Sequence, residues 1–236
     1  MTYLILFLSV AVGAVAVRFV QVENRLRIRL LTAFGGAYVF TVTILHLLPE
    51  AMERAAPSIG YFILAGFFLQ VALEYFSHGI EHGHAHHHSG HGTVPVGIIA
   101  GLCVHAFLEG MPLGGVGWGL PAEHSGRMLL ASIVMHNIPV SIVLVSMLLH
   151  NGLTRGKVLG LVALFAAMSP AGALLGEFAP RLLDVREQLT AVVIGIFLHL
   201  STTILFETSE AHRFNRQKIV AILLGTGVAI GSAWIH

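Results

Sequence analysis

The chain has 236 residues, of which 56% are hydrophobic and 11% are charged, and its mean hydropathy of +0.82 lies well outside the range of soluble domains. The formal net charge is only +1, and the basic residues are spread through short loops, which excludes a basic surface for nucleic acid. The sequence therefore predicts an all-α polytopic membrane protein.

Eight apolar runs, each long enough to cross a bilayer as a helix, follow one another along the chain. They cover residues 2–20, 30–52, 57–79, 94–118, 128–149, 156–179, 188–209 and 217–235. The first run has no basic residue before it and several near or beyond its end, which is the reverse of a secretory signal. We expect it to be a retained span in a single transmembrane domain over residues 1–236.

The basic residues favour one orientation of these spans. With the N-terminus outside, the inner side holds Arg18, Arg25, Arg27, Arg29, Arg155, Lys157, Arg213, Arg216 and Lys218, and the outer side holds Arg54, Arg127, Arg181 and Arg186. This excess follows the positive-inside rule, and it predicts a multi-pass protein of the inner membrane with both termini outside. The first three and last three spans then have opposite orientations, which predicts a 3+2+3 arrangement with inverted repeats.

The second run carries His46 and Glu50, four residues apart near its outer end. The same face of a helix would present both side chains, and a hypothesis is that they capture a cation at the outer mouth. The alternative is that Glu50 is an interfacial carboxylate in water.

The third run ends in a polar stripe of Gln70, Glu74 and His78, which leads into a histidine-rich loop at residues 80–93. The loop histidines are His82, His84, His86, His87, His88 and His91. Such a tract has little apolar material to pack, and its imidazoles can bind metal ions weakly in many arrangements. We expect a cytoplasmic metal collector that tunes transport, and the irregular spacing argues against a purification tag.

The fourth and fifth runs hold the polar groups that best indicate a function. His105 and Glu109 lie one helical turn apart, and antiparallel packing would put His136 at a similar depth, roughly 12 to 14 Å from the shared end. A charge at the bilayer centre costs roughly 2.5 to 3.5 kcal/mol on insertion scales, so these side chains must have a binding partner inside the protein that offsets this cost. We expect them to bind a divalent metal ion. Asn137 is either a further ligand or a hydrogen-bond partner between helices.

The motifs HAFLEG (105–110) and HNIPVS (136–141) resemble the metal-site motifs on the fourth and fifth helices of the ZIP (Zrt/Irt-like) divalent-metal transporters. The motif HLLPEA (46–51), the histidine-rich loop and the eight spans add to the resemblance. It implies transport into the cytoplasm by a sliding form of alternating access, a homodimer, and no resident cofactor.

The chain departs from the family pattern at Ala106, Leu108, Val140 and Ser141, where two usual ligands are missing. We therefore expect one bound ion, held by a set of donors with a single carboxylate and a net charge of +1. The seventh run offers a second carboxylate because it places His199, Thr203 and Glu207 on one face. Because Glu207 lies toward the inner end, it can instead belong to an exit route with His212, and packing or interfacial solvation explains it about equally well.

The function that these residues favour is transport of a divalent transition metal. Imidazole and carboxylate suit Zn²⁺ best, and Fe²⁺, Mn²⁺, Co²⁺ and Cd²⁺ are compatible with the same ligands. One alternative is a membrane hydrolase with a histidine-bound zinc, although the chain lacks HExxH and we do not expect an enzyme. Another is a metal sensor or storage protein, which would need the loop as its sole binding site.

Overall fold

The computed structural model describes residues 1–19, 25–54, 58–77, 93–114, 124–179, 185–206 and 216–234. All regular structure in these ranges is helical. The helices are α1 (Thr2–Ala16), α2 (Arg25–Val42), the π-helical turn η1 (Thr43–Leu47), α3 (Leu48–Arg54), α4 (Ile59–Ser77), α5 (Val96–Gly110), the 3-10 turn η3 (Met111–Leu113), α6 (His124–His150), α7 (Arg155–Phe178), α9 (Arg186–Phe206) and α10 (Arg216–Trp234). Since η1 joins α2 to α3 and η3 extends α5, the described residues form eight helical segments, and the all-helical prediction is confirmed.

Most segments begin and end within a few residues of the apolar runs. Five of the described segments are long and apolar enough to cross a membrane, at 26–53, 96–113, 126–150, 155–178 and 186–206. The helices over 2–16 and 59–75 are apolar but shorter. The first run was expected to stay helical to residue 20, but α1 ends at Ala16 and a turn follows.

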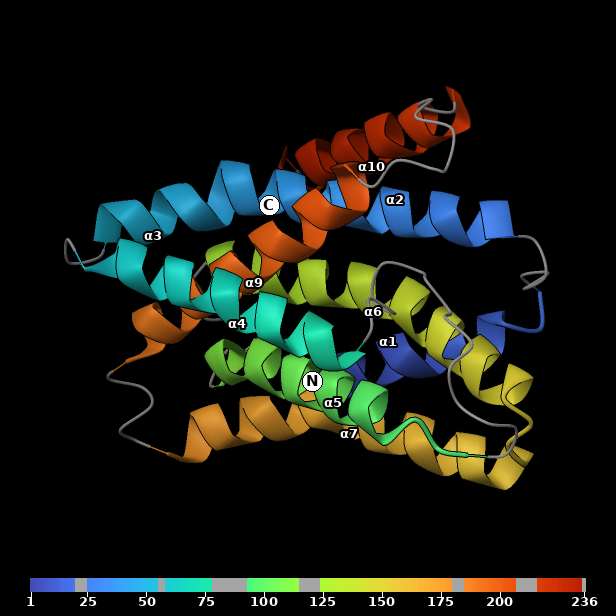
Figure 1. The fold of residues 1–236 in the computed structure, drawn as a ribbon. Helices are drawn as coiled ribbons and strands as arrows, with labels where there is room; N and C mark the ends of the chain where they lie inside the picture. Colours follow the sequence, from blue (N-terminus) through green and yellow to red (C-terminus); the bar gives the residue numbers. More distant parts are fainter. Residues whose placement is uncertain are drawn as a thin grey trace.

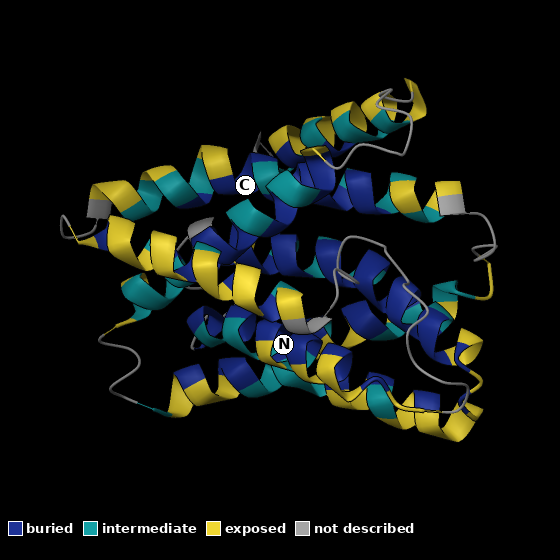
Figure 2. Cartoon of the chain, in the orientation of Figure 1, coloured by how far each residue is buried: buried dark blue, intermediate teal, exposed yellow. Residues whose placement is uncertain are grey.

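The long helices lie roughly alongside one another, with α6 in the middle of the bundle (Figure 1). α1 packs against α6 and α7, α5 against α7, α4 against α9, and α10 against α2. α6 is the most deeply buried of the five span candidates, whereas α4 and α7 turn exposed apolar faces outward (Figure 2). An apolar outer surface of this kind suits contact with lipid.

Two apolar cores meet along α6. One core combines residues of its second half, such as Val143 and Leu148, with buried side chains of α1, α5 and α7. The other combines residues of its first half, such as Leu129 and Ile133, with side chains of α2 and α9. The stretch between Ile133 and Val140 therefore passes from one core to the other, and it contains His136 and Asn137.

Small residues bring two helix pairs close together. A Cβ atom on Gly172 of α7 would overlap the carbonyl oxygen of Phe107 on α5, and one on Gly195 of α9 would overlap the carbonyl oxygen of Ile63 on α4. Close backbone approach through small residues is how membrane helices gain packing energy without a hydrophobic driving force between them. The α5–α7 and α4–α9 pairs are therefore tightly joined.

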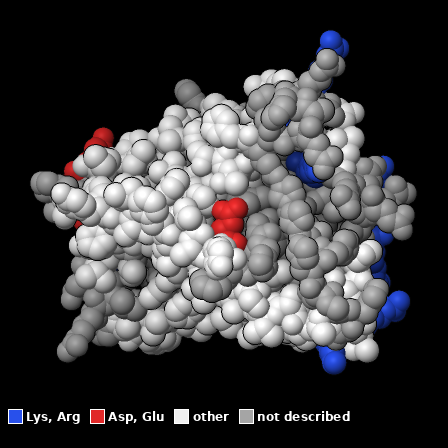
Figure 3. Space-filling view, viewed as in Figure 1, with Lys and Arg blue, Asp and Glu red and all other residues white. Residues whose placement is uncertain are grey.

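Charged side chains sit mostly at the two ends of the bundle. In the view of Figure 3, the Lys and Arg side chains gather toward one end, while acidic side chains lie at the opposite end and at one place in the middle of the face. On this face, the region between the two ends carries few charged side chains, as expected of a protein that spans a bilayer.

Candidate metal centre

Three side chains from α5 and α6 meet inside the bundle. Nε2 of His105 lies 2.8 Å from Oε1 of Glu109, and Nε2 of His136 lies 3.8 Å from the same oxygen. The two Nε2 atoms are 3.4 Å apart. Ligands about 2.0 to 2.2 Å from a tetrahedral zinc ion would be roughly 3.3 Å from one another, and the three observed distances lie on either side of that value.

The sequence explains why these side chains converge. His105 and Glu109 are four residues apart on α5, so they project from the same face of the helix. His136 reaches them from the part of α6 that lies between the two apolar cores. The structure thus brings together the three residues that the two motifs predicted, and their donor atoms all lie within 4.8 Å of one another.

The centre is almost completely shielded from solvent. His105 is 1% exposed, Glu109 is fully buried and His136 is 4% exposed. Apart from the imidazole contacts, neither oxygen of the Glu109 carboxylate has a hydrogen-bond partner among the residues that the structure describes. Since an unpaired buried carboxylate is costly, the group needs a cation or a proton beside it.

Gln70 of α4 fixes the orientation of His105. Its Oε1 lies 2.9 Å from Nδ1 of the imidazole, and the Gln70 side chain is fully buried. A carbonyl oxygen only accepts, so Nδ1 donates and Nε2 keeps the lone pair that faces Glu109 and His136. Histidines that bind metal ions usually have an outer hydrogen-bond partner of this kind.

Neutral imidazoles and a carboxylate would repel one another through their converging lone pairs unless a proton or a cation lay between them. The aromatic contacts keep the rings in this arrangement, since the His136 ring packs edge-on against the His105 ring and against Phe197 of α9. The arrangement suits a divalent cation that prefers nitrogen and oxygen ligands.

The sequence model of the ZIP zinc transporter family matches residues 81–233, well over half of the chain. The chain belongs to the ZIP zinc transporter family. No curated protein sequence matches it. The matched range includes both site motifs, and membership of a transporter family removes the hydrolase interpretation. This ZIP transporter is thus a multi-pass membrane protein with a buried site of metal-binding character.

Asn137 lies beside the centre in sequence but faces α1. Its Nδ2 donates to Oγ of Ser9 at 3.2 Å, which is the helix–helix contact that the sequence allowed as an alternative. Its Oδ1 is buried and has no hydrogen-bond partner in the described part of the chain. Asn137 therefore links α6 to α1 through one amide atom and keeps one oxygen donor unused.

The missing family ligands are replaced by packing. Ala106 is 1% exposed and Val140 is 4% exposed, and both belong to the apolar core shared by α1, α5, α6 and α7. Among the described residues, the metal-binding group contains a single carboxylate. The binding of one ion, expected from the single carboxylate, stays a prediction.

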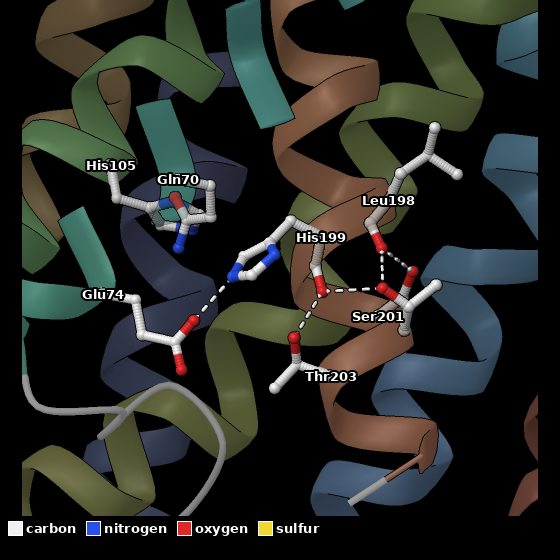
Figure 4. A network of polar contacts seen from close by, with 8 residues as sticks. Gln70, Glu74, His105, Leu198, His199, Ser201 and Thr203 are labelled. Atoms are coloured by element: carbon white, nitrogen blue, oxygen red, sulfur yellow. Dashed lines mark hydrogen bonds and ion pairs between the residues drawn. The ribbon is translucent and has the colours of Figure 1, made fainter. Parts of the chain in front are cut away.

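His199 of α9 lies outside the central group. Its Nε2 is 2.6 Å from Oε2 of Glu74 on α4, and Figure 4 shows the two side chains pointing toward one another. Thr203 donates to the backbone carbonyl of His199 at 2.9 Å. Glu207, which was expected on the same face, lies outside the described residues. The sequence predicted that Gln70 and Glu74 share one face of a helix, but it did not predict that they contact His105 and His199.

The other predicted ligands are placed only in part. His46 lies in the π-helical turn η1 and Glu50 lies in α3, and both are partly exposed, away from the central group. The histidines of the loop, His82, His84, His86, His87, His88 and His91, lie outside the described residues. Their roles remain predictions.

Proposed function

We propose that this ZIP transporter moves a divalent transition metal, most favourably Zn²⁺, into the cytoplasm through a central site formed by His105, Glu109 and His136. The observation that carries the proposal is the convergence of two imidazole nitrogens and an otherwise unpartnered carboxylate in the buried interior. Fe²⁺, Mn²⁺, Co²⁺ and Cd²⁺ accept the same donors.

The charge of the site suits transient binding. One carboxylate and two neutral imidazoles leave a divalent ion with a net charge of +1, which is unfavourable in a low-dielectric interior. Such a site holds an ion less tightly than a fully neutralising one, and a transport site must release its ion again. A water-derived hydroxide or another anion would complete the coordination.

Apolar cores close the site on both sides. The core around Leu129 and Ile133 lies toward one end of the bundle, and the core around Val143 and Leu148 lies toward the other. An ion bound at His136 would therefore be occluded, and access from either side requires one of the cores to part. This is the expectation for alternating access.

The packing supports a sliding motion of two groups of helices. α1, α5, α6 and α7 pack among themselves, α4 packs most closely with α9 and α2 with α10, and the two groups meet where α2 contacts α6 and α4 contacts α5. His105, Glu109 and His136 all belong to the first group, while Gln70 and Phe197 belong to the second. Movement of the first group would carry the ion past the second and break the bond between His105 and Gln70.

The same contacts support inverted repeats. In an inverted repeat, the first three segments correspond to the last three in the same order, and the fourth corresponds to the fifth. The close α4–α9 pair then corresponds to the close α10–α2 pair, and the α5–α7 pair corresponds to the α6–α1 pair. The tripeptide TIL also occurs at 43–45 and at 203–205, in the second and seventh segments. These correspondences support the 3+2+3 arrangement.

The basic end of the bundle supports one orientation in the membrane. Arg27 and Arg29 at the start of α2 and Arg155 and Lys157 at the start of α7 belong to the side that the positive-inside rule assigns to the cytoplasm. We therefore propose an inner-membrane protein with both termini outside. As further parts of this proposal, His46 and Glu50 capture ions at the outer mouth, and the loop at 80–93 collects them in the cytoplasm.

Several finer assignments follow from the family resemblance. His199 and Glu207 are proposed to line the inner route, Asn137 to offer its free oxygen to the passing ion, and the protein to work as a homodimer. None of these is needed for the central site to bind its ion.

Flux of radiolabelled zinc into proteoliposomes tests the proposed function. We expect His105→Ala and Glu109→Ala each to lower the initial rate about tenfold or more, because each removes a ligand from a site with few ligands. Glu187→Ala, which removes an exposed carboxylate from α9, is the matched control and should transport normally. Flux that survives both site substitutions would refute the central site, and zinc binding without flux in the wild type would favour a sensor or storage protein.

A further inference from the structure

A second pair of ionisable side chains lies between α4 and α9, apart from the metal centre. The side chain of His199 is 13% exposed and that of Glu74 is 26% exposed, whereas no side chain of the central group exceeds 5%. A carboxylate that faces lipid is strongly disfavoured, so the exposed part of Glu74 indicates an opening that water can enter. The pair thus lies at a boundary between the protein interior and water.

The pair is linked to the metal centre through α4. Gln70, which accepts the hydrogen bond from His105, is four residues before Glu74, so the two side chains share one face about 6 Å apart along the helix. Figure 4 shows the His199 ring beside this face, with Gln70 and His105 on one side and Glu74 on the other. Polar groups therefore lead from the centre through Gln70 to Glu74, near the end of α4.

The interface between α4 and α9 does not need this pair for its cohesion. Gly66 lies against the carbonyl of Val192, and Gly195 lies against the carbonyl of Ile63, so the two backbones already meet closely. An ion pair within an apolar interface is often no more stabilising than apolar packing of the same volume. A purely structural role therefore gives a poor account of two ionisable groups at this position.

The imidazole is held in a fixed direction. The ring of Phe67 packs edge-on against the ring of His199, with centroids 5.0 Å apart. The nitrogen and oxygen that face one another are 2.6 Å apart, and a zinc ion bound by both would hold them roughly 3.3 Å apart. An adjustment below about 1 Å, within the reach of side-chain rotation, would admit an ion.

We propose that Glu74 and His199 form a second cation site, an inner station that receives the metal ion from the central site and passes it to water. The inference rests on the proposed function for the direction of movement. The donors are one carboxylate and one imidazole, the same types that His105 and Glu109 supply, so the station binds the same class of borderline divalent ion. Water completes the coordination, because both side chains are partly exposed.

Two sites in series explain how an ion can leave a buried centre. Conduction requires binding that is favourable enough to admit the ion and weak enough to release it, and several weak sites achieve this better than one strong site. The inner station offers two protein ligands where the centre offers three. An ion therefore moves from the more completely coordinated site to the less completely coordinated one and then into water.

The decisive variant replaces both residues with amides. Glu74→Gln combined with His199→Gln keeps a hydrogen bond between the two side chains but removes the carboxylate and the imidazole. The parent for this experiment carries serine in place of the six loop histidines, so that the loop does not contribute bound zinc. Equilibrium zinc binding in detergent and zinc flux in proteoliposomes are measured for the parent and for the double variant.

We expect the double variant to bind one zinc ion fewer than the parent, to transport about tenfold more slowly, and to reach half-maximal flux within about twofold of the parental zinc concentration. Glu177→Gln, which neutralises an exposed carboxylate at the end of α7, should leave both measurements unchanged. Unchanged zinc stoichiometry or unchanged flux in the double variant would overturn the proposal.

Glu109→Gln separates this inference from the proposed function. It should remove the central ion and abolish flux while the inner ion stays bound. If Glu109→Gln transported normally, the proposed central site would be wrong, whereas the inner station would still be decided by the stoichiometry of the double variant. If the double variant also lost the central ion, the single Glu74→Gln variant would be measured in its place, with the same two outcomes.

Discussion

Replacement of Gln70 by leucine tests how the protein orients His105, the histidine proposed to bind the metal ion. Gln70 is fully buried, and its Oε1 accepts a hydrogen bond from Nδ1 of His105, at 2.9 Å. Without this acceptor, the ring is no longer held in the tautomer that offers Nε2 to the ion. Loss of such an outer partner weakens metal binding about tenfold to hundredfold, or about 1.4 to 2.7 kcal/mol.

Isothermal titration of purified protein with zinc measures this effect directly, and flux assays add a second test. We expect Gln70→Leu to raise the zinc concentration for half-maximal uptake in proportion to the loss of affinity. Gln70→Glu keeps an acceptor oxygen at the same reach, so it should retain tight binding. Gln217→Leu, on the exposed face of α10, is the control for a polar-to-apolar change. Wild-type affinity in Gln70→Leu would refute the role assigned to this bond.

Three further outcomes test other parts of the structure. Gly172→Ala should destabilise the protein by about 1 to 3 kcal/mol, seen as a lower melting temperature, because the new methyl group overlaps the carbonyl of Phe107; Gly160→Ala, which meets open space on the same helix, should not. Glu50→Ala should slow uptake at limiting zinc but not at saturating zinc, and normal uptake at limiting zinc would exclude a capture role. Deletion of residues 82–91 should change the rate or regulation of transport, and complete loss of transport would contradict a tuning role.

The sequence predicted the helices and the centre of the site because both depend on local patterns. Apolar runs of nearly twenty residues leave few alternatives to a membrane helix, since every backbone polar group must be satisfied internally. The four-residue spacing of His105 and Glu109 fixes their common face on any helix. The depth argument for His136 needed only the length of the two runs.

The partners of the polar stripe on α4 could not be predicted in the same way. Gln70 and Glu74 were recognised as sharing a face, but which helices that face meets depends on the packing of the whole bundle. The structure shows that Gln70 meets α5 and that Glu74 meets α9. His199 was expected to serve the centre together with Glu207, and its contact with Glu74 instead became visible only when α4 and α9 were placed side by side.

The π-helical turn at Thr43–Leu47 changes how the part of the second segment that follows it must be interpreted. A turn of this kind contains one additional residue compared with an α-helical turn, so every side chain after it is rotated by about 100° relative to the regular helical phase. His46 lies within the turn and Glu50 lies after it. A helical wheel that assumes a regular α-helix through both residues therefore gives the wrong direction for the side chains of α3. Removal of one residue from this turn would leave the length of the segment almost unchanged while swinging Glu50 toward a different neighbour.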